Sequence, residues 1–270
     1  MRKLWLLAAL AALLSCASEK KQDEGASKAL VIYYSQTGAT RAVAEELQKQ
    51  LCADIEAIEA VEAYDGDFQA TIQRSQQERA EGVLPEIKPV EADLSQYDVI
   101  FIGYPVWFGT FAPPVESFIK NYDLSGKRII TFCTFGSGGL DSSTADMQRA
   151  LPDADVVMGY GVRNARIESA PAEIEYFLKS NKLVEGEVDL LPDYSALQPV
   201  SEEEIAIYDA ACGDYPMLHA QPVRVGKAAT AAMTYYLYEA EENGQMLKVK
   251  VQVGNEEGAK PEFTEVLRAI

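Results

Sequence analysis

Residues 97–119 have the sequence YDVIFIGYPVWFGTFAPPVESFI, and the predicted fold rests first on this stretch. Its first part, residues 97–104, is an apolar and β-branched run, which is typical of a strand buried on both faces of a parallel sheet. Two adjacent aromatic residues and a glycine follow that run, and Pro113 and Pro114 come next. The stretch therefore predicts a buried strand, a loop at its carboxyl end and a short helix over residues 114–122.

Similar runs lie on both sides of this stretch, at residues 29–34 (ALVIYY) and 128–135 (RIITFCTF). We expect weaker strands at residues 53–60 and 154–161. Helices are expected between the strands at residues 40–51, 65–82 and 142–151, and a closing helix is expected after the last strand at residues 174–183. The first helix is predicted from apolar residues at helical spacing. Because strands and helices alternate, residues 28–183 are predicted to form an α/β domain with a doubly wound parallel sheet.

Composition narrows the class of protein. The chain has 270 residues, enough for one large domain or two ordinary ones, and its 48% hydrophobic content is that of a globular protein. The net charge of −18 argues against a nucleic-acid partner and against adhesion to an anionic membrane. A single histidine, His219, and four cysteines without a CxxC pair argue against a histidine triad and a zinc ribbon, so no metal site is expected.

Residues 1–27 have the pattern of an export signal followed by a polar tether. Arg2 and Lys3 precede a short apolar run at residues 4–14, which is too short to span a bilayer comfortably. The pair Ser15-Cys16 then resembles a bacterial lipoprotein cleavage site, which implies that Cys16 becomes the lipidated N-terminus. The alternative is an ordinary secreted protein with a chance cysteine. We expect an exported protein held only by its lipid on a bacterial membrane, in the periplasm or at the cell surface.

Three segments follow the carboxyl ends of the strong strands, where open α/β sheets bind their ligands. The first loop, residues 35–40 (SQTGAT), places hydroxyls and a glycine before a helix, where a phosphate meets free N–H groups. It has no Gly-Lys-Ser/Thr sequence and is not a Walker A loop. Alternatively, Ser35 or Thr37 simply caps the helix.

The other two loops favour a flat ligand. The second loop, residues 104–110 (YPVWFGT), has two aromatic residues that could stack on a ring system, although core packing of Trp107 is the commoner use. The third loop, residues 134–141 (TFGSGGLD), has three glycines that let the backbone approach a ligand closely, or form a plain turn.

Together, in this order and spacing, the three loops resemble those of the flavodoxin family, from residue 28 to about residue 182. The resemblance implies FMN as the cofactor, with its phosphate on the first loop and its ring between the second and third. The implied cofactor-binding residues are Ser35, Thr37, Gly38, Ala39 and Thr40 for the phosphate, Pro105, Val106, Trp107, Phe108 and Gly109 on one side of the ring, and Thr134, Phe135, Gly136, Ser137, Gly138 and Gly139 on the other.

The resemblance implies electron transfer, or reduction of a small acceptor such as a quinone, with a small molecule or a protein as the redox partner. The sequence does not distinguish a carrier from an FMN-dependent oxidoreductase. It also assigns no catalytic residue, although Tyr104 and Asp141 could donate or accept a proton near the ring. The alternative function is a non-redox binding lipoprotein on the same scaffold.

The tail is predicted to be a second, smaller module. Residues 184–199 are expected to be a linker, and residues 200–270 an α+β domain that begins with a helix capped by Ser201 and Glu204. Strands are expected at residues 222–227, 230–241, 247–253 and 261–267, with a turn at Asn243-Gly244. This order loosely resembles the cystatin-like fold, but residues 226–231 lack its inhibitory Gln-x-Val-x-Gly loop. We expect this module to dock a protein partner.

Overall fold

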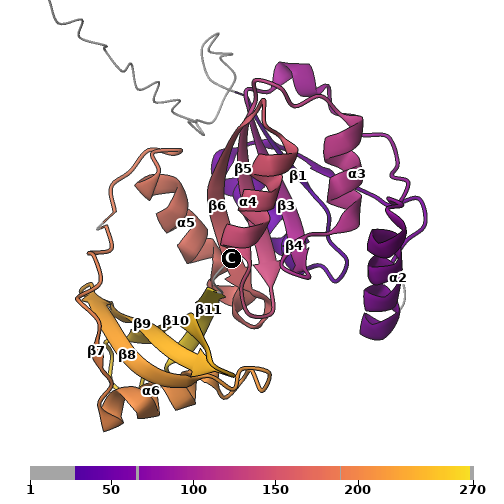
Figure 1. Ribbon diagram of the computed structural model, residues 1–270. Helices are drawn as coiled ribbons and strands as arrows, with labels where there is room; N and C mark the ends of the chain where they lie inside the picture. The colour runs from indigo at the N-terminus through magenta and orange to yellow at the C-terminus, as the bar shows by residue number, and fades with distance from the viewer. Residues whose placement is uncertain (1–27, 65–66, 189, 268–270) are drawn as a thin grey trace, which may run out of the picture.

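The computed structural model describes residues 28–64, 67–188 and 190–267, which fold into two modules (Figure 1). The N-terminal module is built on a sheet with the strand order β2-β1-β3-β5-β6, and all neighbours in this order run parallel. The doubly wound parallel sheet that the sequence predicts is confirmed. Its elements are β1 (Ala29–Tyr33), α1 (Ala39–Leu51), β2 (Asp54–Ala57), α2 (Phe68–Glu81), β3 (Val99–Trp107), β4 (Thr110–Phe111), α3 (Pro113–Asn121), β5 (Arg128–Phe135), α4 (Leu140–Ala150), β6 (Asp155–Arg163) and α5 (Ala170–Ser180), with 3-10 turns η1 (Leu94–Gln96) and η2 (Asn164–Ser169).

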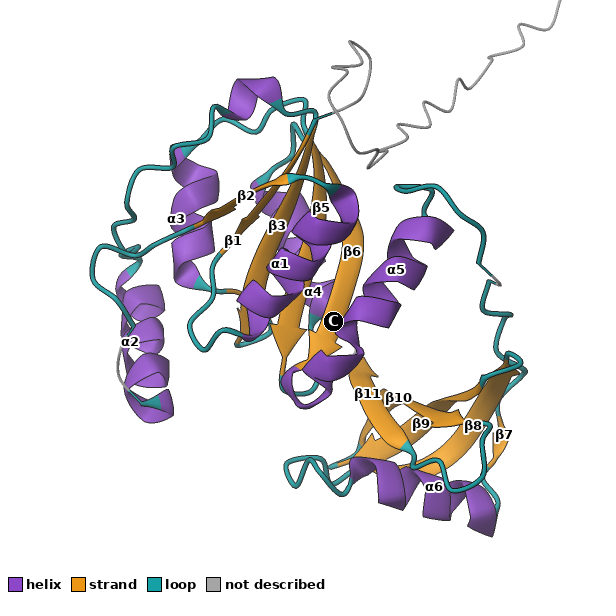
Figure 2. Cartoon of the chain, turned by 180° about the vertical axis from the view of Figure 1, so that it is seen from behind, coloured by secondary structure: helices purple, strands orange, loops and turns teal. Residues whose placement is uncertain are grey.

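Helices cover both faces of this sheet, which explains the continuous apolar strands (Figure 2). Every residue of β1 is buried. One face packs against α1 and α5 through Val43, Leu47 and Ile174. The other face packs against α3 and α4 through residues such as Phe118 and Met147.

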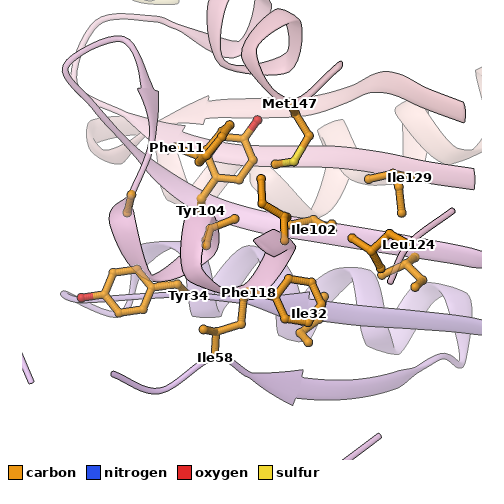
Figure 3. Close-up of a cluster of buried hydrophobic side chains, with 14 of the residues drawn as sticks. Ile32, Tyr34, Ile58, Ile102, Tyr104, Phe111, Phe118, Leu124, Ile129 and Met147 are labelled. Carbon is orange, nitrogen blue, oxygen red and sulfur yellow. The ribbon is translucent and has the colours of Figure 1, made fainter. Parts of the chain in front are cut away.

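Tyr104 lies inside the second of these core layers. Figure 3 shows its ring beside Phe111 and Met147, and the Tyr104 and Phe111 ring centroids are 5.9 Å apart. The Tyr104 hydroxyl is fully buried and donates to Ser143 Oγ at 3.2 Å. Burial raises the pKa of this hydroxyl far above its ordinary value. Tyr104 is therefore a core residue that packs on one face of the sheet, and it is not open to a ligand.

The main departure from the predicted elements follows β3. The sequence indicates a strand that ends at Tyr104, but β3 continues to Trp107 and turns back into β4. Phe108 and Gly109 form the turn, with φ values of 55° and 80°. Positive φ at both positions is the geometry of a tight hairpin, although Phe-Gly is not the usual Asn-Gly signal. Part of the second loop is therefore a small β-hairpin.

The C-terminal module consists of α6 packed on an antiparallel sheet with the order β11-β10-β9-β8-β7. The predicted capping box is confirmed, since Ser201 and Glu204 each bond the backbone N–H of the other. The Asn243-Gly244 turn is confirmed as well, with positive φ at both residues. The elements are β7 (Gln198–Pro199), α6 (Glu202–Cys212), β8 (Gln221–Ala229), β9 (Met233–Glu242), β10 (Gln245–Gly254) and β11 (Glu262–Leu267).

Two details of this module differ from the prediction. Thr230 lies in the turn between β8 and β9 instead of in a strand, and its hydroxyl accepts a hydrogen bond from the Met233 N–H. The end of the expected linker forms β7, and Ser195 N already donates to Lys227 O at 2.8 Å. An edge strand pairs with a neighbour on one side only, so it tolerates proline and polar residues. Its sequence therefore lacks the usual apolar strand pattern.

None of the described helices is long and apolar enough to cross a membrane. The expected export signal and Cys16 lie outside the described residues.

Candidate functional site at the carboxyl edge of the sheet

The three loops meet at one edge of the sheet. They follow β1, β3 and β5, which are direct neighbours and run parallel. The chain leaves β1 for β2 on one side and reaches β3 on the other, so the strand order reverses here. This reversal is the point at which open α/β sheets form a ligand crevice.

The first loop forms an open helix N-terminus. Ser35 Oγ accepts from the Gly38 N–H at 3.2 Å, and Gly38 has a φ of 95°, a conformation that favours glycine. The start of α1 has no side-chain cap, so its first N–H groups are directed toward the loop without a side-chain partner. Thr37 and Gly38 are exposed, while Ser35 and Ala39 are partly buried. This arrangement can hold an anion on backbone donors.

Three of the predicted binding residues, Thr40, Thr134 and Phe135, lie below the surface of the site. The hydroxyls of Thr40 and Thr134 are 2.9 Å apart, and both residues are buried. This contact joins the start of α1 to the end of β5. The two threonines therefore fix the first loop relative to the third, and Phe135 is buried beside them in the core.

The second loop presents its aromatic residues in different ways. Trp107 packs in a cluster with Tyr34 and Tyr64, at ring centroid distances of 5.9 and 5.3 Å. Phe108, at the tip of the hairpin, is 49% exposed, and the Arg79 guanidinium lies 5.8 Å from its ring centroid. Phe108 is thus the open aromatic surface of this loop, and Trp107 forms its partly buried base.

The second and third loops touch each other. Ser142 Oγ donates to Gly109 O at 2.6 Å. A Cβ on Gly139 would lie 2.7 Å from Val106 Cγ1, so only glycine allows this approach. Pro105 and Val106 are partly buried at the base of the hairpin, and Asp141 is partly buried in the first turn of α4.

The third loop is also covered by the C-terminal module. Val266 N donates to Ser137 O at 2.6 Å, and a Cβ on Gly138 would lie 2.1 Å from Val266 O. Arg163 Nε donates to Gly136 O at 2.9 Å. The structure therefore brings all three loops together, and it places the tail against the third.

Several residues that shape this edge are not marked by the three loop sequences. Tyr34 follows β1 and Tyr64 lies in the segment before α2, and together they enclose Trp107. The pKa of each hydroxyl is raised, mainly by burial and, for Tyr64, also by its hydrogen bond to Glu78. Both hydroxyls therefore stay neutral at physiological pH. Tyr34 belongs to the predicted strand run, but nothing in the local sequence links Tyr64 to the site.

The similarity of this chain to known proteins lies in its N-terminal module. A family model described as Flavodoxin matches residues 28–175. A candidate flavoprotein from Bacteroides uniformis is 26% identical, with a TM-score of 0.50, over 55% of this chain and 98% of its own. One from Bacteroides eggerthii is 29% identical, with a TM-score of 0.48, over 56% and 98% of the two chains.

A flavoprotein from Lactobacillus acidophilus, solved in complex with FMN, is 24% identical, with a TM-score of 0.47, over 57% of this chain and 100% of its own. No match was found among curated proteins. The matched region is the N-terminal module, and the family model ends before the C-terminal module begins.

Proposed function

This chain belongs to the flavodoxin family, and from that premise we propose that it is an exported electron-transfer protein that binds FMN at the three loops. FMN is the cofactor of the family, and it supplies the redox chemistry itself, while the protein supplies binding and electrostatics. The observation that carries the proposal is the convergence of the three loops at the carboxyl edge of β1, β3 and β5.

The residues at this edge fit FMN in charge and shape. The uncapped start of α1 and the hydroxyls of Ser35 and Thr37 suit a phosphate, and neutral donors can bind it despite the net charge of −18. The exposed ring of Phe108 suits one face of a flat ring system. The glycines of the third loop let its backbone come close to such a ring.

The proposed electron transfer needs no proton from Tyr104. Tyr104 is buried and bonded to Ser143, so it does not donate protons to a ligand at the loops. The chain's own part is to hold the cofactor, keep water from one side of it and set the charge around it. With FMN bound there, a small acceptor or a protein would take up electrons at the open side of the site, next to Phe108.

A matched pair of substitutions at Gly38 tests the cofactor site. The position has φ 95°, and a Cβ added there would have no atom within 4 Å, so both Asn and Asp fit sterically, and both tolerate positive φ better than most residues. Gly38→Asp adds a negative charge beside the phosphate, and Gly38→Asn adds the same shape without it. We expect Asp to weaken FMN binding about tenfold more than Asn, or roughly 1.4 kcal/mol.

FMN affinity is measured by titrating the fluorescence of the flavin. Equal affinities for the two variants would place the phosphate elsewhere and contradict the site assignment.

We also propose that Cys16 is lipidated and holds the protein on the outer side of a membrane. The support is the order of positive residues, short apolar run and Ser15-Cys16 in the sequence. A lipid anchor would bring the open edge of the sheet near acceptors that dissolve in the membrane.

One observation favours the second candidate function, a non-redox binding protein. A cavity of about 710 Å³ lies between α5 and the sheet of the C-terminal module, away from the three loops. Four of its twelve lining residues are aromatic, namely Tyr160, Tyr176, Phe177 and Tyr235. A pocket of this size and character suits a small organic ligand. This candidate leads if the folded chain does not bind FMN.

A further inference from the structure

Arg163, at the end of β6, is a buried cation that joins the two modules. Its exposed fraction is 2%. Nη1 donates to Phe263 O at 2.9 Å and faces the Asp214 carboxylate at 3.2 and 3.3 Å. Its guanidinium carbon lies 4.0 Å from the Phe263 ring centroid. Burying a charge costs free energy unless it is paired and hydrogen-bonded, so these partners determine where the arginine lies.

The same side chain also holds the third loop. Arg163 Nε donates to Gly136 O, and Val266 N, from the outer strand β11, donates to the next carbonyl, Ser137 O. Gly138 has no room for a side chain against Val266. Two consecutive carbonyls of the third loop are therefore bonded to donors that the docking of the C-terminal module keeps in place.

These bonds fix the direction of two peptide groups. The chain has no cis peptide among its described residues, and in a trans peptide the N–H points opposite to the C=O. The N–H groups of Ser137 and Gly138 therefore point away from Arg163 and β11. Neither N–H has a hydrogen-bond partner among the described residues.

We propose that the C-terminal module is an internal support for the flavin site, and that Arg163 is its positioning residue. Docking of the module holds the third loop so that the N–H groups of Ser137 and Gly138 are presented to the cofactor as fixed donors. This inference rests on the proposed function, because it needs FMN at the three loops. It gives the tail a role within this chain, in addition to any partner that it docks.

The proposal has a redox consequence. Donors that are fixed before the reaction favour the state with more negative charge, and reduction adds negative charge to the flavin ring. Loss of the support lets the two peptides turn, so the donors no longer stabilise that charge. We expect the reduction potential of bound FMN to become more negative, and its affinity to fall.

The test compares three variants of the full chain. Arg163→Ala removes the bond to Gly136 O, and Val266→Pro removes the N–H that bonds Ser137 O. The control is Arg166→Ala, because Arg166 is also buried and joins the modules through Glu262 of β11, but makes no hydrogen bond or ion pair with the third loop.

The two readouts are FMN affinity and the reduction potential of the bound flavin, and far-UV circular dichroism checks the fold. We expect Arg163→Ala and Val266→Pro each to weaken FMN roughly tenfold, the size of one net hydrogen bond, and to lower the potential. Arg166→Ala should leave both near the wild-type values. If Arg163→Ala does not fold, Arg163→Lys replaces it, since lysine keeps the charge near Asp214 but lacks the planar fork.

An unchanged potential in the folded loop variants would overturn the proposal. An equal shift in Arg166→Ala would overturn the assignment of Arg163 as the positioning residue, because loss of any contact between the modules would then have the same effect as loss of the bonds to the third loop. Failure of the wild-type chain to bind FMN is a different result, which overturns the proposed function itself.

Discussion

At the scale of single residues, Phe108 combines an exposed aromatic ring with a backbone conformation that favours glycine. Its φ is 55°, and its side chain is 49% exposed at the tip of the β3–β4 hairpin. Residues held in sparsely populated conformations cluster at functional sites, where the strain is tolerated for the sake of the function. The ring of Phe108 is therefore expected to serve the ligand more than the fold.

Phe108→Gly separates these two roles. Glycine adopts the positive φ without strain, so the melting temperature of the FMN-free protein should stay the same or rise. Loss of the ring should weaken FMN by roughly threefold to tenfold, the value of one aromatic contact of about 0.5–1.5 kcal/mol. Thermal unfolding and flavin titration are measured side by side. A destabilised apoprotein with unchanged affinity for FMN would show that Phe108 is a structural residue.

Cys212, at the end of α6, gives a second test at this scale. Its thiol is free and packed in the core of the C-terminal module, and burial raises its pKa to about 12. The thiolate is the form that reacts with alkylating agents, so almost none is present at pH 8. We expect iodoacetamide to leave Cys212 unmodified in the native chain and to modify it in guanidinium chloride, as read by peptide mass spectrometry. Rapid native labelling would mean that α6 does not pack as described.

At the scale of elements, α6 depends on its first turn. The Ser201 hydroxyl accepts from Glu204 N, and Glu204 returns the bond to Ser201 N. Ser201→Ala leaves an N–H of the helix start without this partner, so it should lower the free energy of unfolding by about 1 kcal/mol. Denaturant titration gives the value, and Ser201→Asn, which keeps a capping oxygen, is the control. Equal losses in both variants would argue against a capping role.

The same turn makes the free energy of unfolding depend on pH. The Lys227 ammonium, and then the Ser201 N–H, hold the pKa of Glu204 below its ordinary value. A carboxylate with a depressed pKa contributes stability above its ordinary pKa of 4.5, and loses it as the pH falls through the folded value. The stability difference between wild type and Glu204→Gln should therefore be largest above pH 4.5 and shrink below it. A difference that grows on acidification would contradict this assignment.

The elements differ in how far sequence alone predicts them. Strands β1 and β5 are buried on both faces, so their runs of apolar residues mark them almost to the residue. The hairpin after β3 carries no such mark, because Phe-Gly is a rare pair for a tight turn and Pro105 lies within the strand. Its geometry depends on contacts made elsewhere, such as Ser142 with Gly109.

At the scale of the whole molecule, the contacts between the two modules are the feature that the sequence does not predict. The three loops follow the carboxyl ends of strands whose alternation with helices the sequence indicates, and the strand order of the structure brings these ends together. The partners of Arg163 lie 51 and 100 residues further along the chain, and no local pattern joins them. Whether Gly138 faces solvent or Val266 is decided only when the tail docks.

The proposed anchor is also a property of the whole molecule. Cys16→Ser removes the thiol that would carry the lipid. We expect the wild-type chain to fractionate with membranes when expressed in a bacterium, and the variant to lose that attachment. Metabolic labelling with a fatty acid provides the direct readout. Label on the variant, or none on the wild type, would contradict lipidation at Cys16.

The central claim is that this chain carries FMN at the carboxyl edge of its parallel sheet. The most direct measurement is the visible absorption spectrum of the purified chain, offered excess FMN and then freed of unbound flavin. We expect about one flavin for each chain, with shifted absorption bands and quenched fluorescence, because the ring would lie against Phe108 and the third loop. A folded chain that stays colourless would contradict the claim.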